Sequence, residues 1–111
     1  LRDENILIIG SGNIVHNLGE LSYGQYDTRV APWAAGFDSM IAGDLLAANH
    51  DRLVAFDEVY GDSARRAHPT VDHYLPLLYA AGAAGSGKVR FIYEGFQHAS
   101  LSMRCVLFGE V

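Results

Sequence analysis

The chain has little cysteine and little positive charge. Its only cysteine, Cys105, allows no internal disulfide, which fits a reducing compartment, and we expect a cytoplasmic protein. Cys105 lies in the apolar run 103–108, so we expect a buried thiol. The 8 Lys and Arg against 13 Asp and Glu give a net charge of −5. Because no basic stripe is present to neutralise phosphates, the composition argues against a nucleic-acid partner.

Long hydrophobic runs are also missing. The longest apolar stretch, residues 75–85, is shorter than the roughly 20 residues that a membrane span needs, so we expect no membrane partner. No basic segment followed by an apolar segment opens the chain, so no signal peptide is visible. The chain starts at Leu1 without a methionine and enters an apolar run almost at once. We therefore expect a piece of a longer protein.

Half of the 111 residues are hydrophobic, which can support the core of one domain. The apolar run Ile6–Ile9 predicts a strand buried on both faces. Pro32 predicts the start of a helix that buries every fourth residue of one stripe, namely Trp33, Phe37, Ile41 and Leu45. Two acidic residues, Asp38 and Asp44, fall off that stripe.

The second half predicts a helix over Leu77–Ala84, with Pro76 in its first turn, and strands over Val89–Tyr93 and Leu101–Phe108. Residues 61–67 are expected to be a polar connection. The order of elements predicts an α/β layered fold, a mixed sheet flanked by helices, whose last two strands are antiparallel.

Two histidines stand in constrained settings. His16 follows the predicted buried strand closely, and His73 lies where a helix is about to start. Histidine is the commonest metal ligand and the usual acid or base near neutral pH, and ligands gather at the carboxyl ends of strands in open α/β sheets. Each could instead be a structural residue, and Asp72 could orient an imidazole or favour the helix start. We predict that His16 and His73 approach one pocket.

The other histidines give weaker signals. His68 and His73 are five residues apart, which is not the spacing of a chelating pair on one helix. His50 is expected at a helix end on the surface. The roles of His98 and of the nearby carboxylate Glu94 stay open, since each could line a pocket or face water.

A dinucleotide site is a further alternative, because Gly10 and Gly12 form a G-x-G pattern after the first predicted strand. Val15, however, stands where a third glycine or alanine should be, and a polar loop over residues 21–30 replaces the expected strand with an acidic end. The glycines are better explained as allowing a sharp turn that presents His16.

Five segments, in order, resemble a known family: Ser11–Leu18 (SGNIVHNL), Pro32–Ala34 (PWA), His68–Tyr79 (HPTVDHYLPLLY), Glu94–Phe96 (EGF) and Ser100–Arg104 (SLSMR). They are similar to the carboxyl-terminal part of class III extradiol ring-cleavage dioxygenases, in the 4,5-DOPA dioxygenase branch of the LigB-like superfamily. The resemblance implies that residues 1–111 are the carboxyl-terminal part of one larger catalytic domain.

The resemblance also implies an activity and its residues. Such an enzyme opens a catechol ring with O₂ at a non-haem iron(II) centre, and zinc can replace iron in a purified sample. The family's acid/base matches His16, and one of its metal ligands matches His73. The other ligands come from the amino-terminal half, so a missing half or a partner chain is expected to supply them. The alternative is a non-catalytic member of the fold that binds a metal or a partner.

Overall fold

The computed structural model describes residues 1–23, 29–85 and 87–109. The polar loop expected over residues 21–30 therefore lies partly outside the described residues. The elements, in chain order, are η1 (Arg2–Glu4), η2 (Leu18–Glu20), α1 (Pro32–Leu46), α2 (His50–Val54), α3 (Phe56–Tyr60), α4 (Asp62–Ala67), α5 (Leu75–Ala84), β1 (Val89–Tyr93), β2 (Phe96–Gln97), β3 (Leu101–Ser102) and β4 (Cys105–Phe108).

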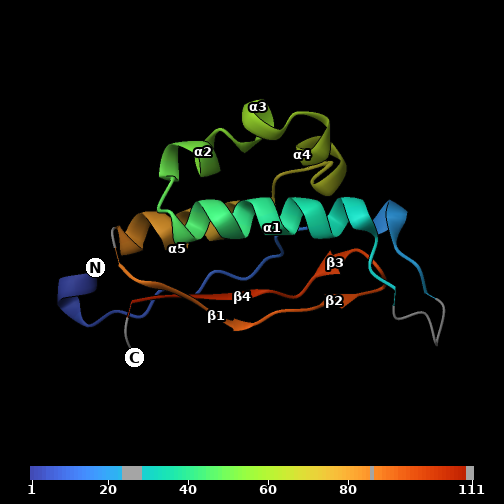
Figure 1. Ribbon diagram of the computed structural model, residues 1–111. Helices are drawn as coiled ribbons and strands as arrows, with labels where there is room; N and C mark the ends of the chain where they lie inside the picture. Colours follow the sequence, from blue (N-terminus) through green and yellow to red (C-terminus); the bar gives the residue numbers. More distant parts are fainter. Residues whose placement is uncertain (24–28, 86, 110–111) are drawn as a thin grey trace.

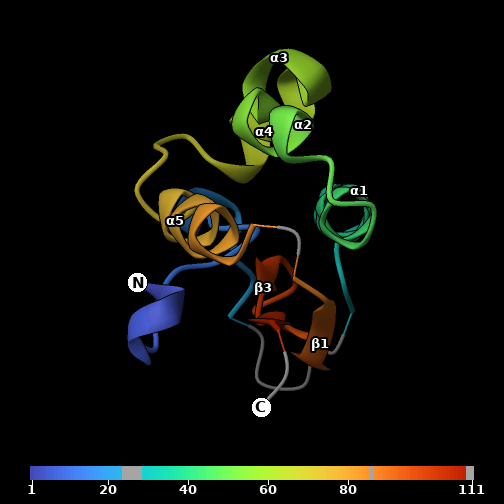
Figure 2. The same cartoon turned by 90° about the vertical axis from the view of Figure 1, so that its left-hand side faces the viewer.

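The elements form layers. The long helix α1 and helix α5 run above the strands, and the short helices α2, α3 and α4 lie on the other side of these two helices (Figures 1 and 2). Strand β1 pairs with β4 and β2 pairs with β3, both antiparallel. The α/β layered fold and the antiparallel pairing of the last strands are thus confirmed. No helix in the described part of the chain is long and apolar enough to cross a membrane.

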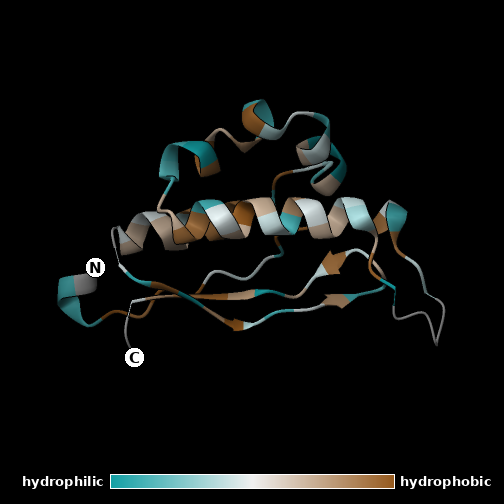
Figure 3. Ribbon diagram, viewed as in Figure 1, coloured by the Kyte–Doolittle hydropathy of each residue, from teal (hydrophilic) through white to brown (hydrophobic). Residues whose placement is uncertain are grey.

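Helix α1 forms as the sequence predicts. Pro32 stands in its first turn, where a missing N–H costs nothing, and Phe37, Ile41 and Leu45 are buried in the core. Trp33 is only half-buried, since it lies near the helix start under the guanidinium of Arg66. In Figure 3, hydrophobic and hydrophilic colours alternate along α1.

Asp38 and Asp44 are both buried, which a single apolar stripe does not predict. Helix α1 lies between two layers, so its second face is covered as well. Asp44 accepts hydrogen bonds from Arg52 and Tyr60 on the side of the short helices. Asp38 pairs with Arg104 on the side of the strands. Each buried charge therefore has a partner, as burial requires.

Three local expectations are wrong. Residues 61–67 are not a polar connection, because Gly61, at φ 54°, ends α3 and α4 begins at once. The strand expected over Leu101–Phe108 is broken at residues 103–104, where Arg104 turns towards helix α1, and it forms β3 and β4 instead. Cys105 is exposed at the start of β4 rather than buried.

The first predicted strand is also absent, since Ile6–Ile9 pairs with no strand of the described residues. Leu7 is 76% exposed and Ile9 is 81% exposed, although both were expected to be buried. With helix α5 and strand β4, this segment lines a cavity of about 520 Å³. The apolar residues are those of a buried strand, but the described chain places no strand beside them.

This exposed apolar segment leads to a prediction about the isolated chain. An extended segment with exposed apolar side chains and an unpaired backbone can pair with another chain. The 111-residue chain is therefore expected to self-associate. Sedimentation velocity over a range of concentrations measures this. Replacing Leu7 and Ile9 by threonine should reduce the association, whereas the same change at exposed Val54, on α2, should not. A chain that stays monomeric at all concentrations would contradict the prediction.

Candidate functional site

The motif-bearing segments meet at one place. The backbone N–H of Asn13 donates to the carbonyl of His73 at 2.9 Å, and that of His16 donates to the carbonyl of Ala67 at 2.9 Å. The side-chain amide of Asn13 donates to the carbonyl of Ser102 at 2.7 Å, and Ser102 N–H donates to Val15 at 3.2 Å. Residues 13–16 are thus held between the turn before α5 and strand β3.

This arrangement brings His16 and His73 together, as predicted. Their imidazole rings stack with centroids 3.4 Å apart and planes 7° from parallel. Both side chains are half-buried, and the cavity described above is lined by His73 but not by His16. The geometry shows that these two histidines are in contact. Their roles as acid/base and metal ligand stay predictions.

Two glycines make this close approach possible. A Cβ atom on Gly12 would lie 2.3 Å from the carbonyl oxygen of His73, and one on Gly10 would lie 2.6 Å from that of Pro76. Neither glycine has a positive φ. Glycine is therefore needed because a side chain would not fit, and not for the sharp turn expected from the sequence. The G-x-G pattern is explained by packing of one backbone on another.

His73 has a partner that suits a metal ligand. Its Nδ1 lies 3.1 Å from Oδ2 of Asp72, and the other carboxylate oxygen of Asp72, Oδ1, accepts a hydrogen bond from the hydroxyl of Thr70. That hydroxyl is the main cause that lowers the pKa of Asp72 and keeps it ionised. In a neutral imidazole whose Nδ1–H donates to a carboxylate, the Nε2 lone pair is free for a cation. The geometry therefore supports the alternative in which Asp72 orients an imidazole, namely that of His73.

The surroundings of His16 lower the pKa of its imidazole. Burial is the main cause that lowers its pKa below the usual 6.5, and the proximity of His73 lowers it further. A group with a lowered pKa is neutral at pH 7, where an imidazole can accept a proton. Asp72 acts in the opposite direction, but its effect is the smallest of the causes.

His68 is a functional candidate that the sequence reasoning missed. Its ring is only 5% exposed, its Nε2 lies 2.6 Å from the carbonyl oxygen of Ile14, and its Nδ1 has no hydrogen-bond partner among the described residues. Burial lowers the pKa of His68 to about 4. The position of His68 at the start of the HPT motif could have indicated a function. Its spacing from His73 indicated only that the two do not form a chelating pair on one helix.

The pKa of His68 predicts a pH dependence of stability. The pKa of His68 is about 4 in the folded chain and about 6.5 in the unfolded chain. Between these two pH values only the unfolded chain binds the proton, so the folded state loses stability as the pH falls through this range. Lowering the pH from about 7 to about 5 should cost about 2 kcal/mol of unfolding free energy. Urea unfolding at both pH values measures the loss, and His68→Gln should remove most of it. An equal loss in the variant would contradict the assignment.

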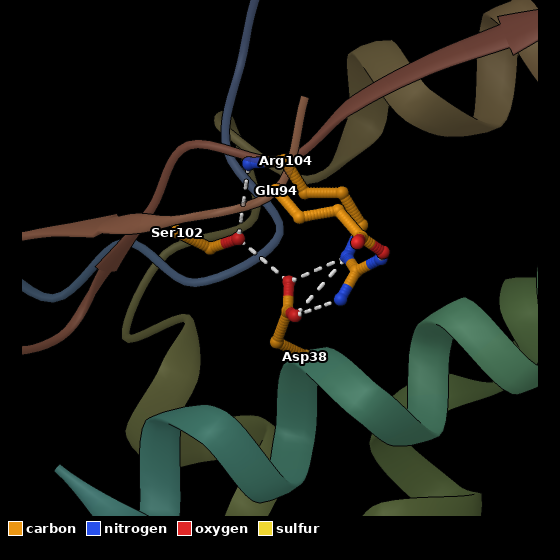
Figure 4. A network of polar contacts seen from close by, with 4 residues as sticks. All are labelled: Asp38, Glu94, Ser102 and Arg104. Carbon is orange, nitrogen blue, oxygen red and sulfur yellow. Dashed lines mark hydrogen bonds and ion pairs between the residues drawn. The ribbon is translucent and has the colours of Figure 1, made fainter. Parts of the chain in front are cut away.

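A second missed feature is the polar network in Figure 4, which joins α1 to the strands. Arg104 donates to both carboxylate oxygens of Asp38, at 2.6–3.2 Å, and also pairs with Glu94. The hydroxyl of Ser102 donates to Asp38 at 2.6 Å. The carbonyl of Ser102 also accepts a hydrogen bond from the side chain of Asn13, so the network is connected to the segment that carries His16. Glu94, whose role was open, is an exposed ion-pair partner.

The remaining histidines lie elsewhere. His98 is exposed and its ring contacts that of Tyr23 at 4.8 Å, and His50 is the half-buried first residue of α2. Over the described residues no three His, Cys, Asp or Glu side chains gather as a metal site. The described residues therefore do not by themselves provide a metal site of three such side chains.

Comparison with known proteins defines the class. The family of catalytic LigB subunits of aromatic ring-opening dioxygenases matches residues 1–109, and the chain belongs to this family. A 4,5-DOPA dioxygenase extradiol of Escherichia coli K12 is 36% identical over 98% of this chain and 41% of its own length. That of Portulaca grandiflora is 32% identical over 100% of this chain and 41% of its own length.

A solved structure agrees with this assignment. The crystal structure of an uncharacterized protein from Escherichia coli K12 superimposes with a TM-score of 0.85 at 35% identity, over 98% of this chain and 45% of that chain. The resemblance read from the motifs, to a carboxyl-terminal part of the 4,5-DOPA dioxygenase branch, is confirmed. The chain spans about two-fifths of the length of the curated relatives.

Proposed function

We propose that the full-length protein carrying this chain is an extradiol dioxygenase that opens a catechol ring with O₂ at a non-haem iron(II) centre. The observation that carries the proposal is the stacked pair of His16 and His73, built from the two motif segments that resemble the family. His73 is the metal ligand in this proposal and His16 is the acid/base. The exposed free thiol of Cys105 suits the cytoplasmic location that we include in it.

His73 fits an iron(II) or zinc ligand because Asp72 fixes its ring through Nδ1 and leaves Nε2 open. The other ligands are proposed to come from the rest of the full-length protein, or from a partner chain. Iron(II) held there supplies a centre that brings the two catechol oxygens and O₂ together and relays charge between them. The isolated chain, with one of the ligands, is expected to be inactive.

His16 performs the proton chemistry. Its lowered pKa leaves it neutral at pH 7, so its ring accepts a proton from a catechol hydroxyl as the substrate binds. The resulting imidazolium later returns that proton to an oxygen atom when the bond between the two oxygen atoms of O₂ breaks. If His73 held the metal, stacking on His73 would keep His16 next to a substrate bound there.

Oxygen uptake by the full-length protein tests the proposal. Reconstituted with iron(II), it should consume one O₂ per catechol and give a ring-opened semialdehyde, whereas resorcinol and hydroquinone, whose hydroxyls are not adjacent, should give no uptake. An iron-loaded protein that leaves every catechol intact would contradict the proposal.

The non-catalytic alternative has one observation in its favour, because the described residues contain no group of three His, Cys, Asp or Glu side chains that could hold a metal. In that case the family fold binds a metal or a partner without cleaving rings. The sequence of the full-length protein separates the two. The remaining histidine ligands are expected there if it is an enzyme, and loss of one of them would favour the non-catalytic alternative.

A further inference from the structure

His68 is the buried polar group that the proposed function does not use. Its ring lies in an aromatic cluster, with ring centroids 5.9 Å from Phe37, 6.1 Å from Phe56 and 5.2 Å from Tyr74. A phenylalanine or leucine would fill such a place without any polar atom. The presence of an imidazole therefore needs a reason other than packing.

The hydrogen bonds of His68 fix its chemical form. Nε2 faces the carbonyl oxygen of Ile14 at 2.6 Å, and because a carbonyl only accepts, Nε2 carries the proton. Nδ1 is then an acceptor without a donor among the described residues. A buried acceptor left unsatisfied destabilises the folded state. The bond to Ile14 is thus the one polar gain that His68 is seen to bring.

Ile14 stands two residues before His16, and the intervening Val15 is fully buried. The residue before His68 grips the same segment, since the carbonyl of Ala67 accepts from His16 N–H at 2.9 Å. Two consecutive residues at the end of α4 therefore hold both ends of the segment 14–16. Without the bond to Ile14, the segment would keep its backbone bonds at Val15 and His16 but lose the one that precedes them, so the His16 ring would be held less firmly against His73.

We propose that His68 is a positioning residue whose Nε2–H bond to the Ile14 carbonyl holds the His16 ring in its stack on His73. The proposal rests on the proposed function only in giving His16 a chemical role. The stack of the two rings is measured by NMR and not by turnover, so the test is independent of any activity.

The test is NMR on the full-length protein that carries this chain, kept free of metal. Stacked rings with centroids 3.4 Å apart give a nuclear Overhauser cross-peak between the imidazole protons of His16 and His73. His68→Phe keeps a ring in the cluster but removes the donor, and the cross-peak should disappear. His68→Gln places an amide N–H near the same carbonyl, and the cross-peak should be kept.

Tyr74→Phe is the matched control. Tyr74 is fully buried in the same cluster and donates to a backbone carbonyl, that of Leu53, at 2.7 Å. This variant should lower the melting temperature and keep the cross-peak. A folded His68→Phe chain that keeps the peak, a folded His68→Gln chain that loses it, its loss in Tyr74→Phe, or its absence from the unmodified chain would each overturn the proposal. If His68→Phe does not fold, His68→Gln decides.

Discussion

Replacing His73 by alanine in the full-length protein is expected to remove most of the bound iron, whereas replacing His16 by alanine is expected to leave the iron in place. The reason is that His73 offers a free Nε2 while His16 lies over the face of that ring. Loss of a general acid/base typically costs about 10²–10⁴ in rate, so His16→Ala should lose ring cleavage by that order.

Elemental analysis, read beside oxygen uptake with a catechol, measures both effects. His50→Ala is a suitable control, because His50 begins α2 away from the pair and should change neither the iron content nor the rate. Iron lost from His16→Ala but kept by His73→Ala would reverse the two roles. Iron and full activity kept by both variants would contradict the site.

Gly12→Ala is expected to have the largest effect on stability. The added Cβ would lie 2.3 Å from the carbonyl oxygen of His73, and the obstacle is backbone that the turn before α5 holds in place. Overpacking of this kind should cost about 3 kcal/mol of unfolding free energy. The segment 13–16 would be displaced, so the His16–His73 stack should be lost as well.

Urea unfolding measures this cost, with Gly36→Ala as the matched control. Gly36 lies in helix α1 with open space where its Cβ would be, so alanine there should be neutral or should stabilise the chain by up to about 1 kcal/mol. A Gly12→Ala chain as stable as the unmodified one would show that the two backbones do not approach as described.

Local signals in the sequence predict the helices best. Pro32 with a four-residue apolar spacing predicts α1, and Pro76 predicts the first turn of α5, because each signal acts within one or two helical turns. Strand β1 and its antiparallel pairing with β4 also follow from local pattern and order. The positions of His16 after an apolar run and of His73 before a helix predicted that the two histidines lie close together.

Features that join distant parts of the chain could not be predicted in the same way. The bond between Asp38 and Arg104 spans 66 residues, and nothing near either residue signals the other. The burial of His68 against Ile14, 54 residues away, is of the same kind. For the segment Ile6–Ile9 the local signal predicted an inner strand, but no strand of the described residues pairs with it.

The central claim is that this chain carries the acid/base and one metal ligand of a ring-opening dioxygenase. Isotope incorporation tests it most directly, with the iron-loaded full-length protein, a catechol and ¹⁸O₂. We predict a ring-opened product with one ¹⁸O atom in its carboxylate and a second in its aldehyde, trapped by immediate reduction. A quinone, or a ring-opened product without ¹⁸O, would contradict the account.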